Sequence, residues 1–177
     1  MRLAVTTALD PDAAEREAAA RVAAEFGWKV APRGRRGLAR VAVDCQADAL
    51  LVLSARRAAL WIDGTERAWT AGMGELRLQR LLRGEHATLD GLLAAAALQP
   101  GDAVLDATLG LGMDALVMAA AVGPGGSVVG LEASPVLAAL TAEGLRRHPA
   151  EAARRITVRA SDADAFLAQL PARSFDV

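Results

Sequence analysis

The sequence predicts an α/β protein in which a parallel sheet with helices on its faces follows a small α+β unit. Two observations lead to this prediction. From residue 103 onward, short apolar runs alternate with stretches of helical length, the order that is typical of repeated strand–helix units. A loop with two glycines, Gly110 and Gly112, directly follows the first of these runs, as in proteins that bind a nucleotide beside the carboxyl ends of parallel strands.

Residues 1–70 are expected to form the small α+β unit. Leu3–Thr7 has the character of a strand, and a helix is expected to follow, with Asp10 as its N-cap and Pro11 in its first position. Gly27 is expected to end that helix. Further strands are expected at residues 28–31, 49–53 and 58–62, with a helix at 38–45 and a turn at 63–64.

Residues 71–177 are expected to form the second unit, after a glycine-containing junction at 72–74. Two helices are expected before the sheet, one ending near Arg83 and one spanning 89–98 with Thr88 as its cap. Three strand–helix units in succession then favour a parallel sheet. The strands are expected at 103–106, 127–131 and 156–159, the helices at 113–121, 135–147 and 163–170, and a further strand begins at Phe175.

The composition is that of a globular protein, with 53% hydrophobic and 23% charged residues. The net charge of −1 gives the whole chain no basic footprint for nucleic acid. Cys45 is the only cysteine, which excludes an internal disulfide and a cysteine-based zinc cluster. No apolar run approaches the ~20 residues of a membrane span. We therefore expect a cytoplasmic protein without metal and without membrane attachment.

Local charge is more uneven than the net charge. Two groups of arginines fit a solvated surface, and they also fit contact with an RNA backbone. The second group recurs every three residues, close to one helical face. The groups are Arg33, Arg35, Arg36 and Arg40, and Arg77, Arg80 and Arg83. Neither histidine has a recognisable triad partner: His148 is interpreted as a helix-end residue and His86 as a loop residue.

Candidate ligand groups stand at the ends of all three predicted strands. Asp106 ends the first, Glu132 follows the second, and Ser161 and Asp162 follow the third. The carboxyl ends of parallel strands lie on one rim of a sheet, so these groups are expected to come together. Each acid alone also fits a helix N-cap or a solvated loop, but an acidic rim repels itself and usually awaits a partner.

Two kinds of ligand fit the glycine loop. Gly110-Leu-Gly112-Met-Asp114-Ala115 matches the dinucleotide pattern G-x-G-x-x-G/A, with Glu132 about twenty residues later. A pyrophosphate, however, favours a positive helix end with bare N–H groups, whereas Asp106 and Asp114 would face it here. S-adenosylmethionine has no phosphate and carries a sulfonium and an ammonium, so these acids favour it over a dinucleotide.

S-adenosylmethionine also gives the remaining groups a role. Glu132 would accept two hydrogen bonds from the ribose diol, and Asp162 would accept one from the adenine amino group. The two glycines admit a ligand without a Cβ in the way. Thr108 stands where many such loops carry a further glycine, and its hydroxyl is expected to bond the loop backbone in a turn of ordinary dihedral angles.

The segments "LDATLGLGMDALVMA", "GLEASP", "ASDADAF" and "SFDV" resemble the bacterial methyltransferases that modify a guanine exocyclic amine in small-subunit ribosomal RNA. The resemblance implies a class I methyltransferase fold, which is a Rossmann-like parallel sheet. It also implies S-adenosylmethionine contacts at Met113–Asp114, Glu132–Ala133 and Ser161–Asp162. Better-known members of this family carry arginine where Met113 stands and a second serine where Asp162 stands, whereas Thr108 belongs to the family pattern.

Members of that family continue past the strand expected at Phe175 into an aspartate-proline-methionine-aromatic motif, which is implied to hold the target amine. The sequence ends at Val177, before such a motif. We therefore expect a sheet truncated after the third strand–helix unit, with the catalytic motif beyond residue 177. No residue of the sequence is assigned to catalysis.

The favoured hypothesis is an S-adenosylmethionine-dependent methyltransferase that acts on ribosomal RNA. A methyltransferase that acts on a small molecule or a protein fits the same acidic rim, since the rim serves only the cofactor. An NAD-binding oxidoreductase fits the glycine pattern, and a non-catalytic cofactor-binding module fits residues 1–177 by themselves. The sequence leaves the oligomeric state undetermined.

Overall fold

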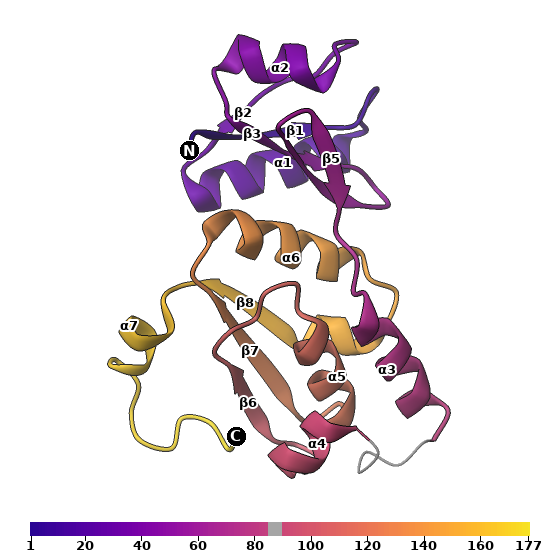
Figure 1. Cartoon of the computed structure of the whole chain (residues 1–177), viewed down its shortest axis with the longest axis vertical. Helices are drawn as coiled ribbons and strands as arrows, with labels where there is room; N and C mark the ends of the chain where they lie inside the picture. Colours follow the sequence, from indigo (N-terminus) through magenta and orange to yellow (C-terminus); the bar gives the residue numbers. More distant parts are fainter. Residues whose placement is uncertain (85–89) are drawn as a thin grey trace. The chain divides into compact units, whose positions relative to one another are not determined.

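A computed structural model describes residues 1–84 and 90–177 of the chain (Figure 1). The described residues form two compact units, Met1–Trp69 and Thr70–Val177, which we name the N-terminal and the C-terminal unit. The expected helix cap Thr88 and the expected loop residue His86 lie outside the described residues. Within those described ranges, none of the helices has the length and apolarity needed to span a membrane.

The N-terminal unit is a mixed five-stranded sheet with two helices. Its strands are β1 (Leu3–Thr7), β2 (Lys29–Val30), β3 (Ala49–Leu53), β4 (Ala58–Ile62) and β5 (Thr65–Ala68), and its helices are α1 (Ala13–Phe26) and α2 (Leu38–Cys45). The strand order is β2-β1-β3-β4-β5. β1 pairs in parallel with β2 and β3, whereas β4 pairs antiparallel with β3 and β5.

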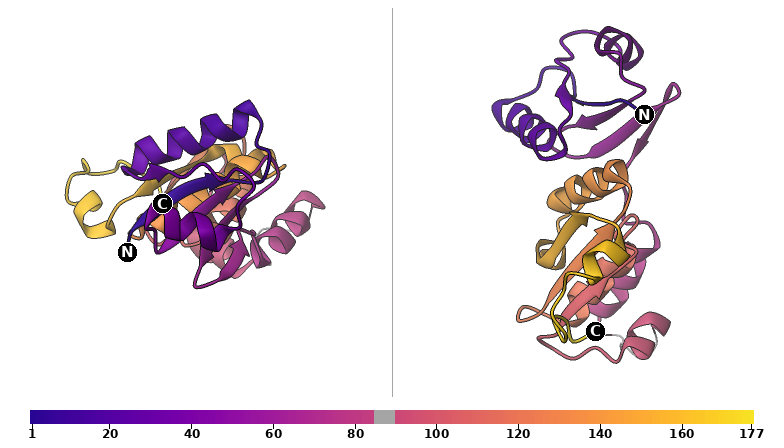
Figure 2. Two further views of the ribbon diagram at one scale, coloured as in Figure 1. Left: turned by 90° about the horizontal axis from the view of Figure 1, so that it is seen from above. Right: turned by 90° about the vertical axis from the view of Figure 1, so that its left-hand side faces the viewer.

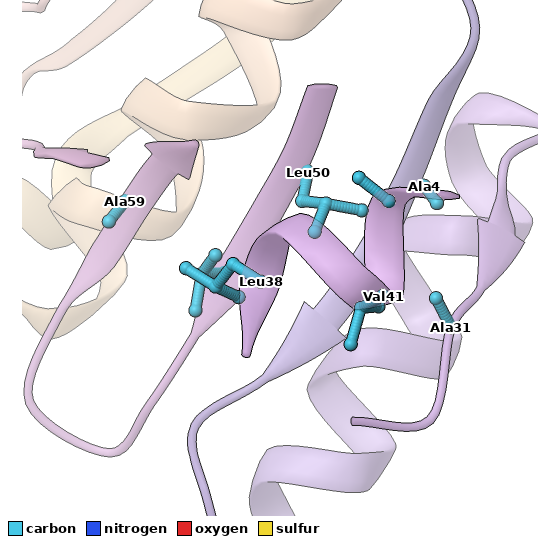
Figure 3. Close-up of a cluster of buried hydrophobic side chains, with 8 residues drawn as sticks. Ala4, Ala31, Leu38, Val41, Leu50 and Ala59 are labelled. Carbon is cyan, nitrogen blue, oxygen red and sulfur yellow. The ribbon is translucent and has the colours of Figure 1, made fainter. Parts of the chain in front are cut away.

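β3 is the centre of this unit, since it is buried along its whole length. α1 and α2 lie on opposite sides of the sheet (Figure 2), so the side chains of β3 meet apolar partners on both faces. Under α2, Leu38 and Val41 share one buried cluster with Leu50 of β3 and Ala4 of β1 (Figure 3). The unbroken apolar run of β3 is thus explained by its central place.

The first helix begins later than predicted, and Asp10 is not its N-cap. Asp12 caps it: the Asp12 Oδ1 atom accepts a hydrogen bond from the Glu15 backbone N–H at 2.8 Å, and Glu15 Oε2 accepts one from the Asp12 N–H at 3.0 Å. This reciprocal capping box satisfies two backbone donors at once, which explains why the helix starts there. Asp10 instead takes a φ of 51° in the preceding turn.

The C-terminal unit is a three-stranded parallel sheet with helices before and between its strands. The helices α3 (Met73–Leu82) and α4 (Gly91–Ala96) precede the sheet. The sheet region contains β6 (Ala103–Asp106), α5 (Met113–Ala121), β7 (Ser127–Glu132), α6 (Pro135–Arg147), a 3₁₀ helix (Glu151–Arg155), β8 (Ile156–Ala160) and α7 (Ala163–Leu167). The strand order is β6-β7-β8 with both pairs parallel, which confirms the predicted α/β class.

α5 is buried over the middle of its length. Residues 115–119 are all buried, and α5 contacts the sheet as well as α3 and the 3₁₀ helix. Asp114 is its only charged residue, and a helix that is apolar all round is expected in a core. The glycine loop therefore leads directly into a helix whose residues 115–119 are buried in the core of the unit.

The ends of the unit differ from the prediction. α4 stops at Ala96 instead of residue 98, because Ala97 takes a left-handed conformation with a φ of 51°. α7 stops at Leu167 instead of residue 170. None of its residues is buried, so no tertiary packing stabilises a longer helix. The strand expected at Phe175 is not a regular strand. Residues 175–177 lie along β6 through two short backbone bonds, Asp176 N–H to Ala103 O at 2.8 Å and Leu105 N–H to Val177 O at 2.9 Å.

Gly74 is the point where α3 packs closely on α5. A Cβ at Gly74 would lie 2.7 Å from the carbonyl oxygen of Met113 and 2.9 Å from its Cα. We expect Gly74→Ala to lower the free energy of unfolding of the C-terminal unit by about 1–3 kcal/mol, because the backbone of α5 must move and the gain in helix propensity offsets only part of that strain. Urea unfolding followed by far-UV circular dichroism measures the change.

Gly91→Ala is the matched control, since no atom lies within 4 Å of a Cβ at Gly91, and we expect equal or slightly higher stability. All three tryptophans, Trp28, Trp61 and Trp69, belong to the N-terminal unit, so their fluorescence follows that unit separately and should respond to neither substitution. Equal stabilities of the Gly74→Ala and Gly91→Ala variants would contradict the close packing of α3 on α5.

Candidate cofactor site

The carboxyl ends of β6, β7 and β8 bring the predicted ligand groups to one rim of the C-terminal sheet. Asp106 pairs in register with Gly130, and Glu132 pairs with Ala160. Asp106, Glu132 and the residues after β8 therefore follow one another across three adjacent strands (Figure 1). The assignment of each of these residues to a cofactor stays a prediction.

The loop between β6 and α5 is fixed to β7. Leu109 donates its backbone N–H to the Leu131 carbonyl at 2.8 Å. The Leu109 side chain is buried against Gly130, where a Cβ would lie 2.4 Å from Leu109 Cδ1. The absence of a side chain at Gly130 thus makes room for the loop, and the loop backbone has a defined position relative to the sheet before any ligand binds.

Thr108 is held by its backbone instead of its side chain. Asp106 Oδ1 accepts a hydrogen bond from the Thr108 backbone N–H at 3.0 Å, which closes a short turn. The contact that closes the turn is thus made by the Thr108 backbone N–H, and the hydroxyl bond stays a prediction. Thr108 is not among the residues with positive φ, so no glycine is needed at this position.

Gly110 and Gly112 take φ angles of 54° and 75°, which side chains rarely adopt. Gly112 is also the N-cap of α5, and a Cβ there would lie 3.2 Å from Cγ2 of Thr141 on α6. The Thr141 hydroxyl donates to the Gly110 carbonyl at 2.8 Å. Both glycines are thus required by backbone conformation, and α6 holds the loop through Thr141.

Glu132 joins the loop to the start of α6. Its Oε2 accepts a hydrogen bond from the Gly110 N–H at 3.1 Å, and its Oε1 accepts one from the Ser134 N–H at 2.8 Å. Ser134 is the N-cap of α6. An ionised carboxylate has about four lone-pair sites, so each oxygen of Glu132 can still accept a hydroxyl of a diol.

Asp106 sits where its own charge is disfavoured. Burial raises the pKa of the Asp106 carboxyl above its ordinary value, the Thr108 N–H lowers it in part, and the nearby charge of Asp114 raises it further. A cationic group bound beside this carboxyl would offset that cost. The side chain therefore suits the positively charged part of a ligand.

Asp162 has a structural task besides the predicted one. It is the N-cap of α7, and its Oδ1 accepts a hydrogen bond from the Ala165 N–H at 3.0 Å. Ser161 donates its N–H to the Glu132 carbonyl at 3.1 Å and its hydroxyl to the Asp162 carbonyl at 3.1 Å. Ala133 is exposed directly after β7. These residues line the rim beside Glu132.

Arg77 is not available to RNA in the way that the sequence suggested. Its Nε and Nη2 donate to Asp90 at 2.6 and 2.9 Å, and its Nη1 donates to Asp114. The prediction of an arginine group open to RNA is thus corrected for Arg77, which forms ion pairs inside the unit, whereas it stays a prediction for Arg80 and Arg83. Sequence reasoning missed the contacts of Arg77 with Asp90 and Asp114, since no local pattern indicates ion pairs between residues 13 and 37 positions apart.

The chemistry of the rim fits a nucleoside with cationic groups. Asp106, Glu132 and Asp162 supply carboxylates, and the guanidinium of Arg77 is fully engaged and does not serve a pyrophosphate. These groups match S-adenosylmethionine, which has a ribose, an adenine amine, an ammonium and a sulfonium but no phosphate. In the part of the chain that the structure describes, no three His, Cys, Asp or Glu side chains are grouped as metal ligands.

Fold and rim together define a Rossmann-like, class I methyltransferase domain. A family model described as "Putative SAM-dependent methyltransferase", SAM being S-adenosylmethionine, matches residues 46–174. The match covers more than half of the chain, and the chain belongs to this family of SAM-dependent methyltransferases, whose cofactor is SAM.

Two individual proteins are similar to this chain. The uncharacterized protein YpiP of Bacillus subtilis (strain 168) is 31% identical over 179 residues, which cover 98% of this chain and 68% of YpiP. The crystal structure of a SAM-dependent methyltransferase from Neisseria gonorrhoeae matches with a TM-score of 0.61 and 20% identity, over 91% of this chain. At that identity the match shows the fold alone. The chain spans 61% of the length of the Neisseria protein.

Glu132→Ala should weaken the binding of S-adenosylhomocysteine by about 1.5–3 kcal/mol, because charge-assisted hydrogen bonds to the ribose and to the loop are lost together. Isothermal titration calorimetry measures the affinity. Glu151→Ala is the control, since Glu151 is an exposed carboxylate that precedes the amino end of β8, whereas the rim lies at the carboxyl ends of the strands, and it should leave the affinity unchanged. An unchanged affinity of the Glu132→Ala variant would remove Glu132 from the site.

Asp106→Asn should stabilise the C-terminal unit at neutral pH. The folded-state pKa of Asp106 lies above its ordinary value, so the ionised carboxylate destabilises the fold above the folded-state pKa and not below the ordinary pKa. The asparagine can still accept the Thr108 N–H. We expect a higher melting temperature than wild type at about pH 7 and no difference near about pH 3, as followed by circular dichroism.

The exposed Asp164 provides the matched control for this pH effect, and Asp164→Asn should show no such pH-dependent gain. A melting temperature of the Asp106→Asn variant below that of wild type at neutral pH would mean that the charge of Asp106 stabilises the fold, which would contradict a carboxylate whose charge is disfavoured by burial.

Proposed function

We propose that this chain is an RNA methyltransferase that transfers the methyl group of SAM to a guanine exocyclic amine in small-subunit ribosomal RNA. The observation that carries the cofactor part is the Glu132 carboxylate, which bonds the glycine loop and the α6 cap at the centre of the acidic rim. The resemblance of "LDATLGLGMDALVMA" and "GLEASP" to the ribosomal RNA guanine-N2 methyltransferases supports the choice of substrate. A cytoplasmic location follows from that substrate.

In this proposal each rim residue has one task toward the cofactor. Glu132 accepts the ribose hydroxyls, and Asp162 accepts the adenine amine through its second carboxylate oxygen. Asp106 and Asp114 face the cationic end. The loop residues and the flanking positions that complete the site are Thr108, Gly110, Gly112, Met113, Ala133 and Ser161.

The protein contributes to this reaction mainly by positioning the two reactants. SAM, when bound, supplies a methyl group on a sulfonium, a leaving group that needs no covalent help from the protein. The methyl group would pass to the amine nitrogen, the sulfur would keep the electron pair of the broken C–S bond as a neutral thioether, and the amine proton would pass to water. The rigid loop orients the cofactor for this displacement. Asp106 attracts the cationic cofactor more than the neutral-sulfur product, which favours product release.

Four arginines of the N-terminal unit, three in the loop at residues 33–37 and one in the first turn of α2, support RNA as the substrate. Arg36 and Arg40 pair with Asp44 at 2.6 and 2.8 Å. Arg33 and Arg36 donate their Nε atoms to each other's carbonyl at 3.1 Å, which folds the loop. Arg33 and Arg35 have no acidic partner in residues 1–84 and 90–177. Their excess positive charge suits phosphates of an RNA backbone.

Replacing both Arg33 and Arg35 by alanine should weaken RNA binding and reduce the slope of log affinity against log salt concentration by about 1–2, since each arginine displaces condensed cations from a phosphate. Fluorescence anisotropy with a small-subunit ribosomal RNA fragment measures both values. Arg57→Ala is the control, because Arg57 is an exposed arginine of the same unit that pairs with Glu66. An unchanged salt slope in the double variant would exclude this loop from RNA contact.

Transfer of labelled methyl groups to unmodified small-subunit ribosomal RNA tests the substrate. Label in a protein or small-molecule fraction instead would favour the alternative methyltransferase classes, and SAM binding without any transfer would favour a cofactor-binding module. The expected aspartate-proline-methionine-aromatic motif after the Phe175 position stays a prediction.

A further inference from the structure

Arg77 on α3 links two acidic side chains from separate parts of the C-terminal unit. Its Nε and Nη2 atoms donate to Asp90 Oδ2 and Oδ1 at 2.6 and 2.9 Å, a two-point contact that is typical of arginine with a carboxylate. Its Nη1 donates to Asp114 Oδ1. Every nitrogen of the guanidinium group therefore has a carboxylate partner.

Arg77 is held firmly in this position. Only 23% of the Arg77 side chain and 14% of the Asp90 side chain are exposed. Asp90 is also the N-cap of α4, and its Oδ1 accepts hydrogen bonds from the Leu92 and Leu93 N–H groups at 3.1 and 3.3 Å. The contact with Arg77 lowers the pKa of Asp90 below its ordinary value, so the pair stays charged around neutral pH. Arg77 is thus in place before a ligand arrives.

Asp114 is held on one side and open on the other. It is the second residue of α5, directly after the glycine loop, and 57% of its side chain is exposed. Arg77 engages Oδ1, whereas Oδ2 has no hydrogen-bond partner among the residues that the structure describes. An exposed carboxylate oxygen with a fixed orientation therefore stands at the end of the loop.

α3 is itself attached to the elements that carry the loop. Gly74 packs against the backbone of Met113, the first residue of α5. Glu75 lies 2.7 Å from Nε2 of His148, which ends α6. Nδ1 of His148 accepts a hydrogen bond from the Ala150 N–H at 3.2 Å, so Nε2 carries the proton and donates to Glu75. Arg77 therefore projects from a helix that is fixed at both α5 and α6.

We propose that Arg77 is a positioning residue, which orients Asp114 so that the free carboxylate oxygen of Asp114 binds the ammonium of the amino-acid part of SAM. The inference rests on the proposed cofactor site. The ammonium is a compact cation with three donors and needs an acceptor that is not already satisfied. Since Arg77 has already ordered the Asp114 side chain, binding costs little further conformational entropy.

Two probes separate positioning from a general structural effect. S-adenosylhomocysteine contains adenosine and the amino-acid part, whereas 5′-methylthioadenosine contains only the thioether and adenosine. We expect Arg77→Met to weaken S-adenosylhomocysteine binding about tenfold and to leave 5′-methylthioadenosine binding within about twofold, because only the first probe carries an ammonium. Calorimetry with the full chain measures both, and circular dichroism checks the fold.

Arg146→Met is the matched control, since Arg146 forms an ion pair with Glu143 on α6 of the same unit and should leave both affinities unchanged. Equal weakening of both probes by Arg77→Met would show that Arg77 only supports the fold, and unchanged binding of S-adenosylhomocysteine would also overturn the inference. Failure of the wild-type chain to bind S-adenosylhomocysteine at all would instead overturn the proposed cofactor site.

Asp114→Asn tests the same inference if Arg77→Met does not fold. Asp114 is exposed, so its substitution should preserve the unit, and it should weaken only S-adenosylhomocysteine. In the Asp114→Asn background, Arg77→Lys should cause no further loss for S-adenosylhomocysteine, because the contact through which it acts is gone. Additive losses of S-adenosylhomocysteine affinity in the double variant would contradict the inference that Arg77 acts through Asp114. Weaker binding of both probes by the Asp114→Asn variant would contradict it as well.

Discussion

The carboxylate of Glu132 is the contact on which the arrangement of the rim depends. It accepts one hydrogen bond from Gly110 in the glycine loop and one from Ser134 at the cap of α6. The loop after β6 and the helix after β7 are thereby joined through the end of the central strand. A carboxylate is suited to this task because it accepts several donors at once and has acceptor capacity left for a ligand.

Three further contacts, made by β7, α6 and α3, also hold the glycine loop and the first turn of α5 in place. Leu109 anchors the loop to β7, Thr141 holds Gly110 from α6, and Arg77 reaches the first turn of α5 from α3. A site that is ordered in this way loses little conformational entropy when it binds a cofactor. The acidic side chains at the rim are consistent with the cationic cofactor SAM of this family and disfavour a pyrophosphate.

The boundaries of several elements were predictable, because the local signals there were strong and agreed with each other. α5 and α6 span the predicted residues, and each begins directly after a glycine or serine cap. The pattern of residues 38–45 is ambiguous by itself, and α2 confirms the helix favoured there. β3 was predictable from its apolar run alone. β5 was missed, because all four of its residues are exposed and it has no apolar alternation; it forms only because β4 offers a free edge.

The sequence by itself determined the order of strands and helices, the glycines that need positive φ, and the acids at the strand ends, since each of these follows from local chemistry and spacing. The tertiary structure alone decided which polar groups meet. Arg77 of α3 forms ion pairs with Asp90 and Asp114, and the Thr141 hydroxyl of α6 donates to the Gly110 carbonyl. Such pairings depend on the distances that packing creates between remote residues, and no local pattern of the sequence records those distances.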